Sequence, residues 1–272
     1  MTAIDISQLA APMVAAAHRA GTLVMEHYQA GGPVRQKADA SPVTQADLAS
    51  EGVILATLAT LLPHIPVVSE EAAAGGVFPE TGELFFLVDP LDGTKEFIAG
   101  RTEFTINIGL VADGEPCFGL IYAPATEALF FTRAEGNPVA ARLSPTEPLP
   151  LWPELTLTPM RARMPANEGL VAAVSRSHMD EATDRFLTEH EICTTLTSGS
   201  SLKFCVLAEG KADVYPRLGR TMEWDTAAGD AILRAAGGVV LTLDGKPLAY
   251  GKSGEGYANP GFVAWGQPPV EA

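Results

Sequence analysis

The spacing of hydrophobic and polar residues predicts two amphipathic helices at the start of the chain. In residues 4–28 hydrophobic side chains recur at intervals of three and four positions, and a Gly-Gly-Pro stretch ends the pattern. A second pattern of this kind covers residues 44–62. Thr44 and Asp47, three positions apart, fit a capping box at its first turn, and Pro63 stops it. The chain therefore opens with two helices that each bury one face.

Short hydrophobic runs predict a sheet after these helices. Residues 84–88 form an unbroken hydrophobic run between two acids, which is too short for a helix and is typical of a buried strand. Residues 65–68 predict a shorter strand before it. Three further runs, at 104–111, 117–122 and 129–132, are separated by turn residues. Strands that follow one another through such short connections predict a sheet that is antiparallel at least in part.

The second half of the chain has a different pattern. Residues 135–167 contain seven prolines and little periodicity, which predicts an irregular connection with a domain boundary between residues 165 and 166. Strands and helices then alternate, which indicates an α/β domain. The predicted strands are 170–175, 212–215 and 239–243, and the predicted helices are 178–188, 200–209 and 224–236. We therefore expect an α+β domain over residues 1–165 and an α/β domain over residues 166–272.

Composition excludes several classes of protein. The chain has 272 residues, 47% of them hydrophobic and 19% charged, which suits a globular protein with a large core. Its net charge of −15 argues against nucleic acid as a partner, because a phosphate backbone would be repelled. Three cysteines without paired spacing predict neither a disulfide framework nor a zinc site. With no signal-peptide pattern and no membrane-spanning run, we expect a cytoplasmic protein.

Acidic residues stand at the ends of several predicted elements. Asp89 and Asp92 follow the central hydrophobic run directly, with a proline between them that we expect to form a turn. Glu70 follows the strand predicted before it, and Asp225 lies at the start of the helix predicted at 224–236. Together with Asp47 these acids could be helix caps or solvated loop residues, but such a set also provides the oxygen ligands that Mg²⁺ or Mn²⁺ prefers. We favour a cation site for Glu70, Asp89, Asp92 and Asp225.

Three motifs then carry a family resemblance. Residues 89–94 (DPLDGT), with the upstream Glu70-Glu71 pair and residues 224–229 (WDTAAG), resemble the inositol monophosphatase superfamily. Residues 198–204 (SGSSLKF) resemble its 3'(2'),5'-bisphosphate nucleotidases, the bacterial branch in particular. The motifs occur in the family's order from residue 44 to residue 238. The resemblance implies a layered αβαβα sandwich of the inositol monophosphatase and fructose-1,6-bisphosphatase type.

The resemblance also implies the reaction and its cofactor. The substrate would be 3'-phosphoadenosine 5'-phosphate, a by-product of sulfur metabolism, and removal of its 3'-phosphate by direct in-line attack of water would give AMP. Two Mg²⁺ ions, or three, would be bound at each site, with Mn²⁺ as a substitute and lithium as an inhibitor. The first ion would be held by Glu70, Asp89 and the carbonyl of Leu91, and the second by Asp89, Asp92 and Asp225. Most of these ligands lie in the first predicted domain, and the second completes the site.

Catalytic and substrate-binding roles follow by the same resemblance. Asp47 and Thr94, with Glu70 as a further candidate, would orient or deprotonate the attacking water. Backbone N–H groups at Gly93 and Thr94, where a helix is predicted to begin, would bind phosphate. The remaining substrate-binding residues implied are Ser200, Ser201, Lys203, Arg217 and Asp225. Lys203 and Arg217 are candidates for the 5'-phosphate, and the alternative for both is a surface ion pair.

Two alternatives to nucleotidase activity remain open. The same cation site would serve an inositol monophosphatase or a fructose-1,6-bisphosphatase, because only the less certain substrate segments discriminate between these enzymes. A catalytically silent, cation-dependent binding module belongs to a different class, although none of the expected ligands is missing. Family members occur as monomers and as homodimers. Some bacterial relatives associate with the inner face of the cytoplasmic membrane, but no basic amphipathic helix predicts that here.

Overall fold

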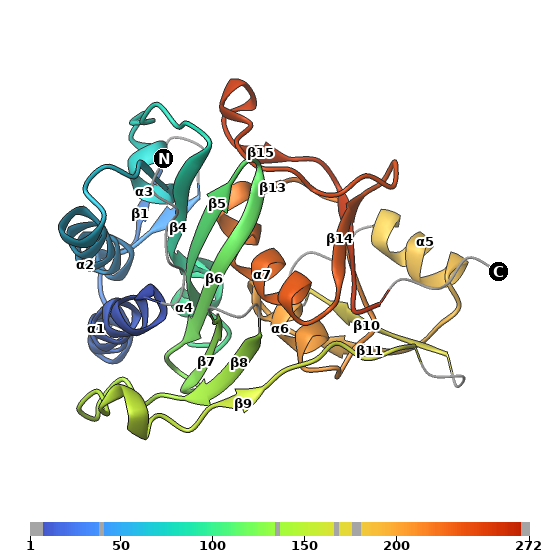
Figure 1. Cartoon of the computed structure of the whole chain (residues 1–272), viewed down its shortest axis with the longest axis horizontal. Helices are drawn as coiled ribbons and strands as arrows, with labels where there is room; N and C mark the ends of the chain where they lie inside the picture. Colours follow the sequence, from blue (N-terminus) through green and yellow to red (C-terminus); the bar gives the residue numbers. More distant parts are fainter. Residues whose placement is uncertain (1–7, 38–40, 134–136, 166–168, 176–180, 268–272) are drawn as a thin grey trace.

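The chain folds into stacked layers of helices and sheets. The computed structural model describes residues 8–37, 41–133, 137–165, 169–175 and 181–267. Figure 1 shows five layers: two outer helices, a seven-stranded sheet, two inner helices, a five-stranded sheet and one helix on its far side. This confirms the expected αβαβα architecture.

The first sheet is formed by β3 (Val67–Ser69), β4 (Leu84–Asp92), β5 (Thr105–Ala112), β6 (Glu115–Ala123), β7 (Ala128–Thr132), β8 (Pro138–Arg142) and β9 (Thr158–Pro159). These strands lie side by side in chain order, and only the pair β3 and β4 is parallel. Strand β4 has both faces buried. Phe85 and Leu87 pack on the side of the inner helices, whereas Phe86 and Val88 pack under the outer helices. Because both faces of this strand are covered, hydrophobic residues do not alternate with polar ones along it, which explains the unbroken hydrophobic run.

The two outer helices are α1 (Ala10–Ala30) and α2 (Gln45–Leu61). The predicted capping box at the start of α2 is confirmed. Thr44 Oγ1 accepts a hydrogen bond from the backbone of Ala46, and Asp47 Oδ2 accepts one from the Thr44 backbone at 2.7 Å. Asp47 is thereby fixed at the end of α2 that faces the carboxyl end of β4.

The second sheet contains β10 (Leu170–Val174), β11 (Ile192–Thr197), β12 (Val214–Arg217), β14 (Val239–Thr242) and β16 (Phe262–Trp265), in the order β11-β10-β12-β16-β14. Strand β10 pairs in parallel with β11 and β12, and the other pairs are antiparallel. Helix α5 (Glu181–Glu189) lies on the outer side, and α6 (Leu202–Ala208) and α7 (Glu223–Ala235) lie between the sheets (Figure 1). Short elements complete the fold: α3 (Glu70–Ala74), α4 (Thr94–Ile98), and the strand pairs β1 (Arg35–Gln36) with β2 (Pro42–Val43) and β13 (Thr221–Met222) with β15 (Ala258–Asn259).

Helix α7 packs very closely on the first sheet. A Cβ atom added to Gly119 would lie 2.1 Å from the carbonyl oxygen of Ala228, and one added to Gly109 would lie 2.8 Å from the Cβ of Ala227. Only glycine on the strands and alanine on the helix permit this approach. Helix α7 belongs to the second predicted domain but packs on the sheet of the first, and the boundary between residues 165 and 166 stays a prediction.

Parts of the prediction were wrong. Residues 135–167 are not irregular throughout, because β8 and β9 extend the first sheet from the edge of β7. Proline is tolerated at the first residue of a strand, so Pro138 does not prevent β8. The expected turn at Pro90 is also wrong: β4 continues to Asp92 with an irregular register against β5. Strand β11 was missed because five of its six residues are exposed and show no hydrophobic alternation.

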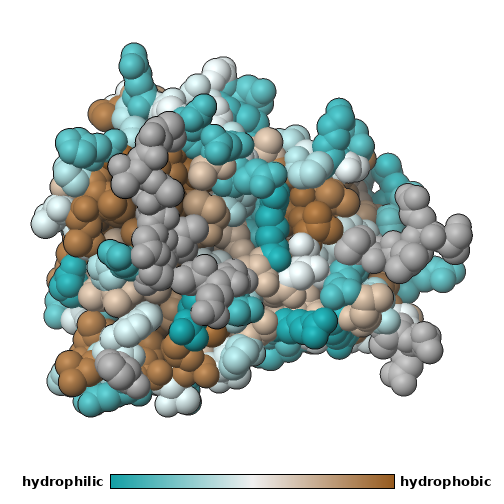
Figure 2. Space-filling model, in the orientation of Figure 1, coloured by the Kyte–Doolittle hydropathy of each residue, from teal (hydrophilic) through white to brown (hydrophobic). Residues whose placement is uncertain are grey.

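Among the described residues, none of the helices combines the length and the hydrophobicity that a membrane span requires. Figure 2 shows one face, where hydrophobic side chains occur in separate patches between hydrophilic ones.

Candidate active site

A cavity of about 300 Å³ opens where the ends of β4, α3, α6 and α7 meet. Most of the site residues expected from the sequence line it: Glu70, Asp89, Leu91, Asp92, Gly93, Thr94, Ser200, Ser201, Lys203, Arg217 and Asp225. Asp47 is not among the lining residues, and reaches the cavity through Thr94. Residues from both halves of the chain therefore converge on one place, although their individual roles stay predictions.

Asp89 is the most deeply buried acid of the cavity, with 1% of its surface exposed. Its Oδ1 accepts a hydrogen bond from the Leu91 backbone at 3.0 Å. Burial raises the pKa of Asp89 well above its usual value, and the neighbouring carboxylates of Glu70, Asp92 and Asp225 raise it further. A carboxylate surrounded by three others is electrostatically unfavourable unless a cation joins it.

Asp92 is held by the segment that begins α6. Its Oδ2 accepts hydrogen bonds from the Ser200 hydroxyl and, at 2.8 Å, from the Ser201 backbone. Asn107 on β5 adds a longer contact of 3.4 Å. Ser200 has a φ of 53°, in the left-handed region that serine rarely adopts. The strained turn thus presents both serines to Asp92, so they fix an acid of the site directly.

Glu70 is the first residue of α3 and has a cationic partner that the sequence did not reveal. Lys37 Nζ lies 2.6 Å from Oε1 of Glu70 and 2.6 Å from Oε1 of Glu71. Burial would lower the pKa of Lys37, but the two acids outweigh it and raise the pKa. Burial raises the pKa of Glu71 to about 7 despite that contact. One ammonium group therefore offsets part of the negative charge at this edge of the cavity.

Thr94 and Asp47 form a hydrogen-bonded pair. Thr94 Oγ1 lies 3.1 Å from Oδ1 of Asp47 and 3.1 Å from the carbonyl oxygen of Leu91. Asp47 is 1% exposed, and its other oxygen is already occupied by Thr44. The Thr94 hydroxyl has a single proton and donates it in one of these two bonds, so its oxygen keeps lone pairs that can accept a hydrogen bond.

Asp225 lies in the first turn of α7. Its Oδ2 accepts a hydrogen bond from the Met222 backbone at 2.7 Å. An acid in this position is favourable, because the first turn of a helix carries a partial positive charge. Burial raises the pKa of Asp225 well above its usual value, and Asp92 and Glu70 raise it further. The carboxylate therefore shares the electrostatic environment of the β4 acids although it comes from the other half of the chain.

Two cationic side chains, Lys203 and Arg217, also line the cavity. The Lys203 side chain is 3% exposed, and its Nζ donates to the carbonyl oxygens of Ser198 at 3.3 Å and Ser200 at 2.5 Å. Burial lowers the pKa of Lys203 to about 8. Arg217 Nε is buried and has no hydrogen-bond partner among the described residues. An unpaired guanidinium nitrogen beside a cavity is costly, which favours an anionic ligand there.

The donor set fits a hard divalent cation. Among the described residues, no three His, Cys, Asp or Glu side chains already stand together as a metal-binding group. Burial nevertheless raises the pKa values of Glu70, Asp89 and Asp225, and repulsion from neighbouring carboxylates raises them further. Oxygen-only donors with no histidine or cysteine among the cavity lining suit Mg²⁺ or Mn²⁺.

Comparison with known proteins finds relatives that match most of the chain. The chain is 41% identical to the 3'(2'),5'-bisphosphate nucleotidase CysQ of Escherichia coli (strain K12) over 248 residues, which cover 90% of this chain and 95% of that protein. It is 33% identical to CysQ of Aggregatibacter actinomycetemcomitans, over 91% of this chain and 88% of that one.

Solved structures of related proteins have the same fold as this chain. The crystal structure of CysQ from Bacteroides thetaiotaomicron superposes with a TM-score of 0.78 at 35% identity, covering 97% of this chain and 98% of that one. An inositol monophosphatase from Anabaena superposes with a TM-score of 0.73 at 24% identity, covering 97% and 92%, which speaks for the fold alone. The profile of the Inositol monophosphatase family matches residues 5–266. The chain belongs to the inositol monophosphatase family, whose members are metal-dependent phosphatases.

Proposed function

We propose that this protein is a 3'(2'),5'-bisphosphate nucleotidase that removes the 3'-phosphate of 3'-phosphoadenosine 5'-phosphate and leaves AMP. The observation that carries the proposal is that acidic and cationic side chains line the same cavity. Asp89, Asp92 and Asp225 are among its acids, and Lys203 and Arg217 are among its cations. A bisphosphate needs both, acids that hold a cation at the phosphate that reacts and cationic side chains for the phosphate that stays. The curated relatives carry the same activity in their names.

The acids of the cavity have the oxygen atoms to bind two Mg²⁺ ions. Glu70, Asp89 and the Leu91 carbonyl would hold one, and Asp89, Asp92 and Asp225 the other. Bound Mg²⁺ supplies a Lewis acid for the phosphoryl oxygens and lowers the pKa of water. A third, weaker ion at Glu70 and substitution by Mn²⁺ stay predictions, as do a cytoplasmic location and the monomeric or dimeric state.

Asp47 and Thr94 would orient the attacking water. When the Thr94 hydroxyl donates its proton to Asp47 Oδ1, at a separation of 3.1 Å, Thr94 Oγ1 is left as an acceptor facing the cavity. A water molecule that donates to Thr94 Oγ1 is held with a lone pair free for the phosphorus. Asp47 acts through Thr94, because it does not line the cavity itself.

Lys203 and Arg217 would hold the 5'-phosphate. Arg217 has a buried donor without a partner, and Lys203 uses two of its three donors on backbone carbonyls. Lys203 therefore has one donor left for a phosphate while it also fixes the turn that carries Ser200. The backbone N–H groups at Gly93 and Thr94 would meet the 3'-phosphate.

The test is phosphate release from three substrates measured side by side: 3'-phosphoadenosine 5'-phosphate, inositol 1-phosphate and fructose 1,6-bisphosphate. Each is run with Mg²⁺, with chelator, and with Mg²⁺ plus lithium. We expect a preference of about a hundredfold in kcat/KM for the nucleotide, which corresponds to about 2.7 kcal/mol in the transition state. Equal rates, or a preference for inositol 1-phosphate, would contradict the nucleotidase assignment. No Mg²⁺-dependent release from any substrate would leave a silent cation-binding module.

A further inference from the structure

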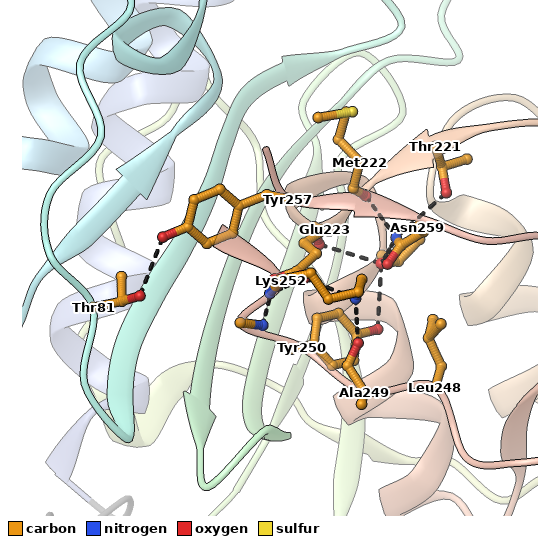
Figure 3. A network of polar contacts seen from close by, with 12 residues as sticks. Thr81, Thr221, Met222, Glu223, Leu248, Ala249, Tyr250, Lys252, Tyr257 and Asn259 are labelled. Atoms are coloured by element: carbon orange, nitrogen blue, oxygen red, sulfur yellow. Dashed lines mark hydrogen bonds and ion pairs between the residues drawn. The ribbon is translucent and has the colours of Figure 1, made fainter. Parts of the chain in front are cut away.

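A buried ionic network stands directly behind the first turn of α7 (Figure 3). Its centre is Glu223, the first residue of the helix, which has no exposed surface. The two carboxylate oxygens accept hydrogen bonds from the backbones of Gly251 and Lys252, both at 2.8 Å. Lys252 Nζ lies 2.7 Å from Oε1 of the same carboxylate. Every polar atom of this buried side chain is therefore engaged by one short segment of chain.

The segment that includes Gly251, Lys252 and Tyr257 also contacts the first half of the chain. The backbone N–H of Glu223 donates to the carbonyl of Tyr257 at 2.9 Å. The Tyr257 hydroxyl lies 3.1 Å from the hydroxyl of Thr81, in the loop before β4 (Figure 3). The Tyr257 ring stacks on Phe78, with centroids 5.9 Å apart. The start of α7 is thus held between its own half of the chain and the loop that leads into β4.

The position of Glu223 relative to Asp225 gives this network a consequence for the cavity. Two residues turn an α-helix by roughly 200°, so the two side chains leave α7 on opposite sides. Glu223 contacts residues 251 and 252, whereas Asp225 lines the cavity. A displacement of Glu223 would therefore move Asp225 toward or away from the β4 acids.

The network is better suited to fixing a position than to adding stability. A buried ion pair gains little over a well-packed hydrophobic pair, because the desolvation of two charges offsets their attraction. Two backbone N–H groups that bind one carboxylate nevertheless define its place within narrow limits. Asn259 adds to this on the same turn, with Nδ2 at 2.9 Å from the carbonyl oxygen of Met222 and 2.9 Å from Thr226 Oγ1.

We propose that Glu223 is a positioning residue, which sets the first turn of α7 so that Asp225 meets the same cation as Asp89 and Asp92. This rests on the proposed function, because it assumes that these acids bind a divalent cation. Residues that orient metal ligands typically contribute about tenfold to a hundredfold in affinity.

The test compares Mn²⁺ affinity, measured by electron paramagnetic resonance well below the unfolding temperature, in two variants of α7. Glu223→Gln keeps the shape but removes the charge that binds Lys252. Asp230→Asn is the matched control: Asp230 is equally buried on the same helix and pairs with Arg234 at 2.6 Å, but does not line the cavity. We expect a tenfold or greater loss of Mn²⁺ affinity and of kcat/KM for Glu223→Gln, and Mn²⁺ affinity within about twofold of the unsubstituted protein for Asp230→Asn.

Three outcomes would overturn the inference. Mn²⁺ affinity unchanged in Glu223→Gln would show that Asp225 keeps its place without the network. Equal losses in both variants would indicate a general loosening of α7. If the unsubstituted protein binds no Mn²⁺, the proposed function fails together with the inference, whereas a failure confined to the variant comparison leaves the function standing. If Glu223→Gln does not fold, Lys252→Met takes its place with the same expected direction.

Discussion

The contact between α7 and the first sheet makes Gly119 a sensitive position. In Gly119→Ala the new Cβ would lie 2.1 Å from the carbonyl oxygen of Ala228 and 3.0 Å from the Cβ of Ala231. A carbon and a carbonyl oxygen need roughly 3.3 Å, so the helix must withdraw by about 1 Å. These neighbours are helix backbone and a short alanine, which cannot rotate away. Such overpacking costs about 1–3 kcal/mol.

The same withdrawal would carry Asp225 with it. A misplacement of about 1 Å in a site costs roughly a hundredfold in rate, so we expect activity to fall further than the loss of stability alone explains. Urea unfolding gives the free energy of unfolding, and phosphate release gives kcat/KM. Gly52→Ala is the matched control, because Gly52 is an exposed position within α2 with no atom within 4 Å of an added Cβ. That variant should gain about 0.5–1 kcal/mol. A Gly119→Ala variant as stable and active as the unsubstituted protein would refute the reasoning.

Three further predictions concern single side chains. Thr94→Val should lower kcat by about a hundredfold or more, whereas Thr94→Ser should keep most of it, because only a hydroxyl can accept a hydrogen bond from the water. Single-turnover phosphate release checks this, and a valine variant at full rate would contradict it. Arg217→Gln should lower kcat/KM for 3'-phosphoadenosine 5'-phosphate by about tenfold to a hundredfold and spare inositol 1-phosphate, which has no second phosphate; equal losses on both substrates would contradict a 5'-phosphate role. Burial raises the pKa of Asp230 from 3.8 to about 6, so the stability that its retained proton confers is complete below about pH 4 and is lost as the pH rises through 6, by about 3 kcal/mol. Urea unfolding from pH 4 to pH 8 should show this loss relative to Asp230→Asn, and parallel pH profiles would contradict it.

Local patterns in the sequence predicted much of the fold. The capping box at Thr44 and the buried run of β4 depend on neighbours within a few positions, and both are present. The acids at the carboxyl end of β4 could be assigned to one site because a strand places its last residues at one edge of the sheet. Asp225 was added to them as a further acid at the end of a predicted element, and the family resemblance then implied its role beside Asp89 and Asp92.

Contacts between distant segments could not be predicted. Lys37 pairs with Glu70 across 33 positions, and Asn107 reaches Asp92 across 15. The spacing of hydrophobic and polar residues does not indicate which distant residues pair. A lone lysine in a polar loop cannot be distinguished from an exposed lysine by sequence. Glu223 was missed for a similar reason, since its partners at residues 251 and 252 lie in a segment for which no element was predicted. Burial of a charged residue becomes visible only when the fold is known.

The central claim is that the acids around Asp89 bind the cation on which catalysis depends. The most direct test is calorimetric titration of Mg²⁺ into the unsubstituted protein and into Asp89→Asn, with Asp113→Asn as the control for charge. Asp113 is exposed in the turn between β5 and β6, with a φ of 53° that asparagine also adopts. We predict that Mg²⁺ binding and Mg²⁺-dependent phosphate release are lost in Asp89→Asn and kept in Asp113→Asn. Mg²⁺ binding of full strength in Asp89→Asn would contradict the account.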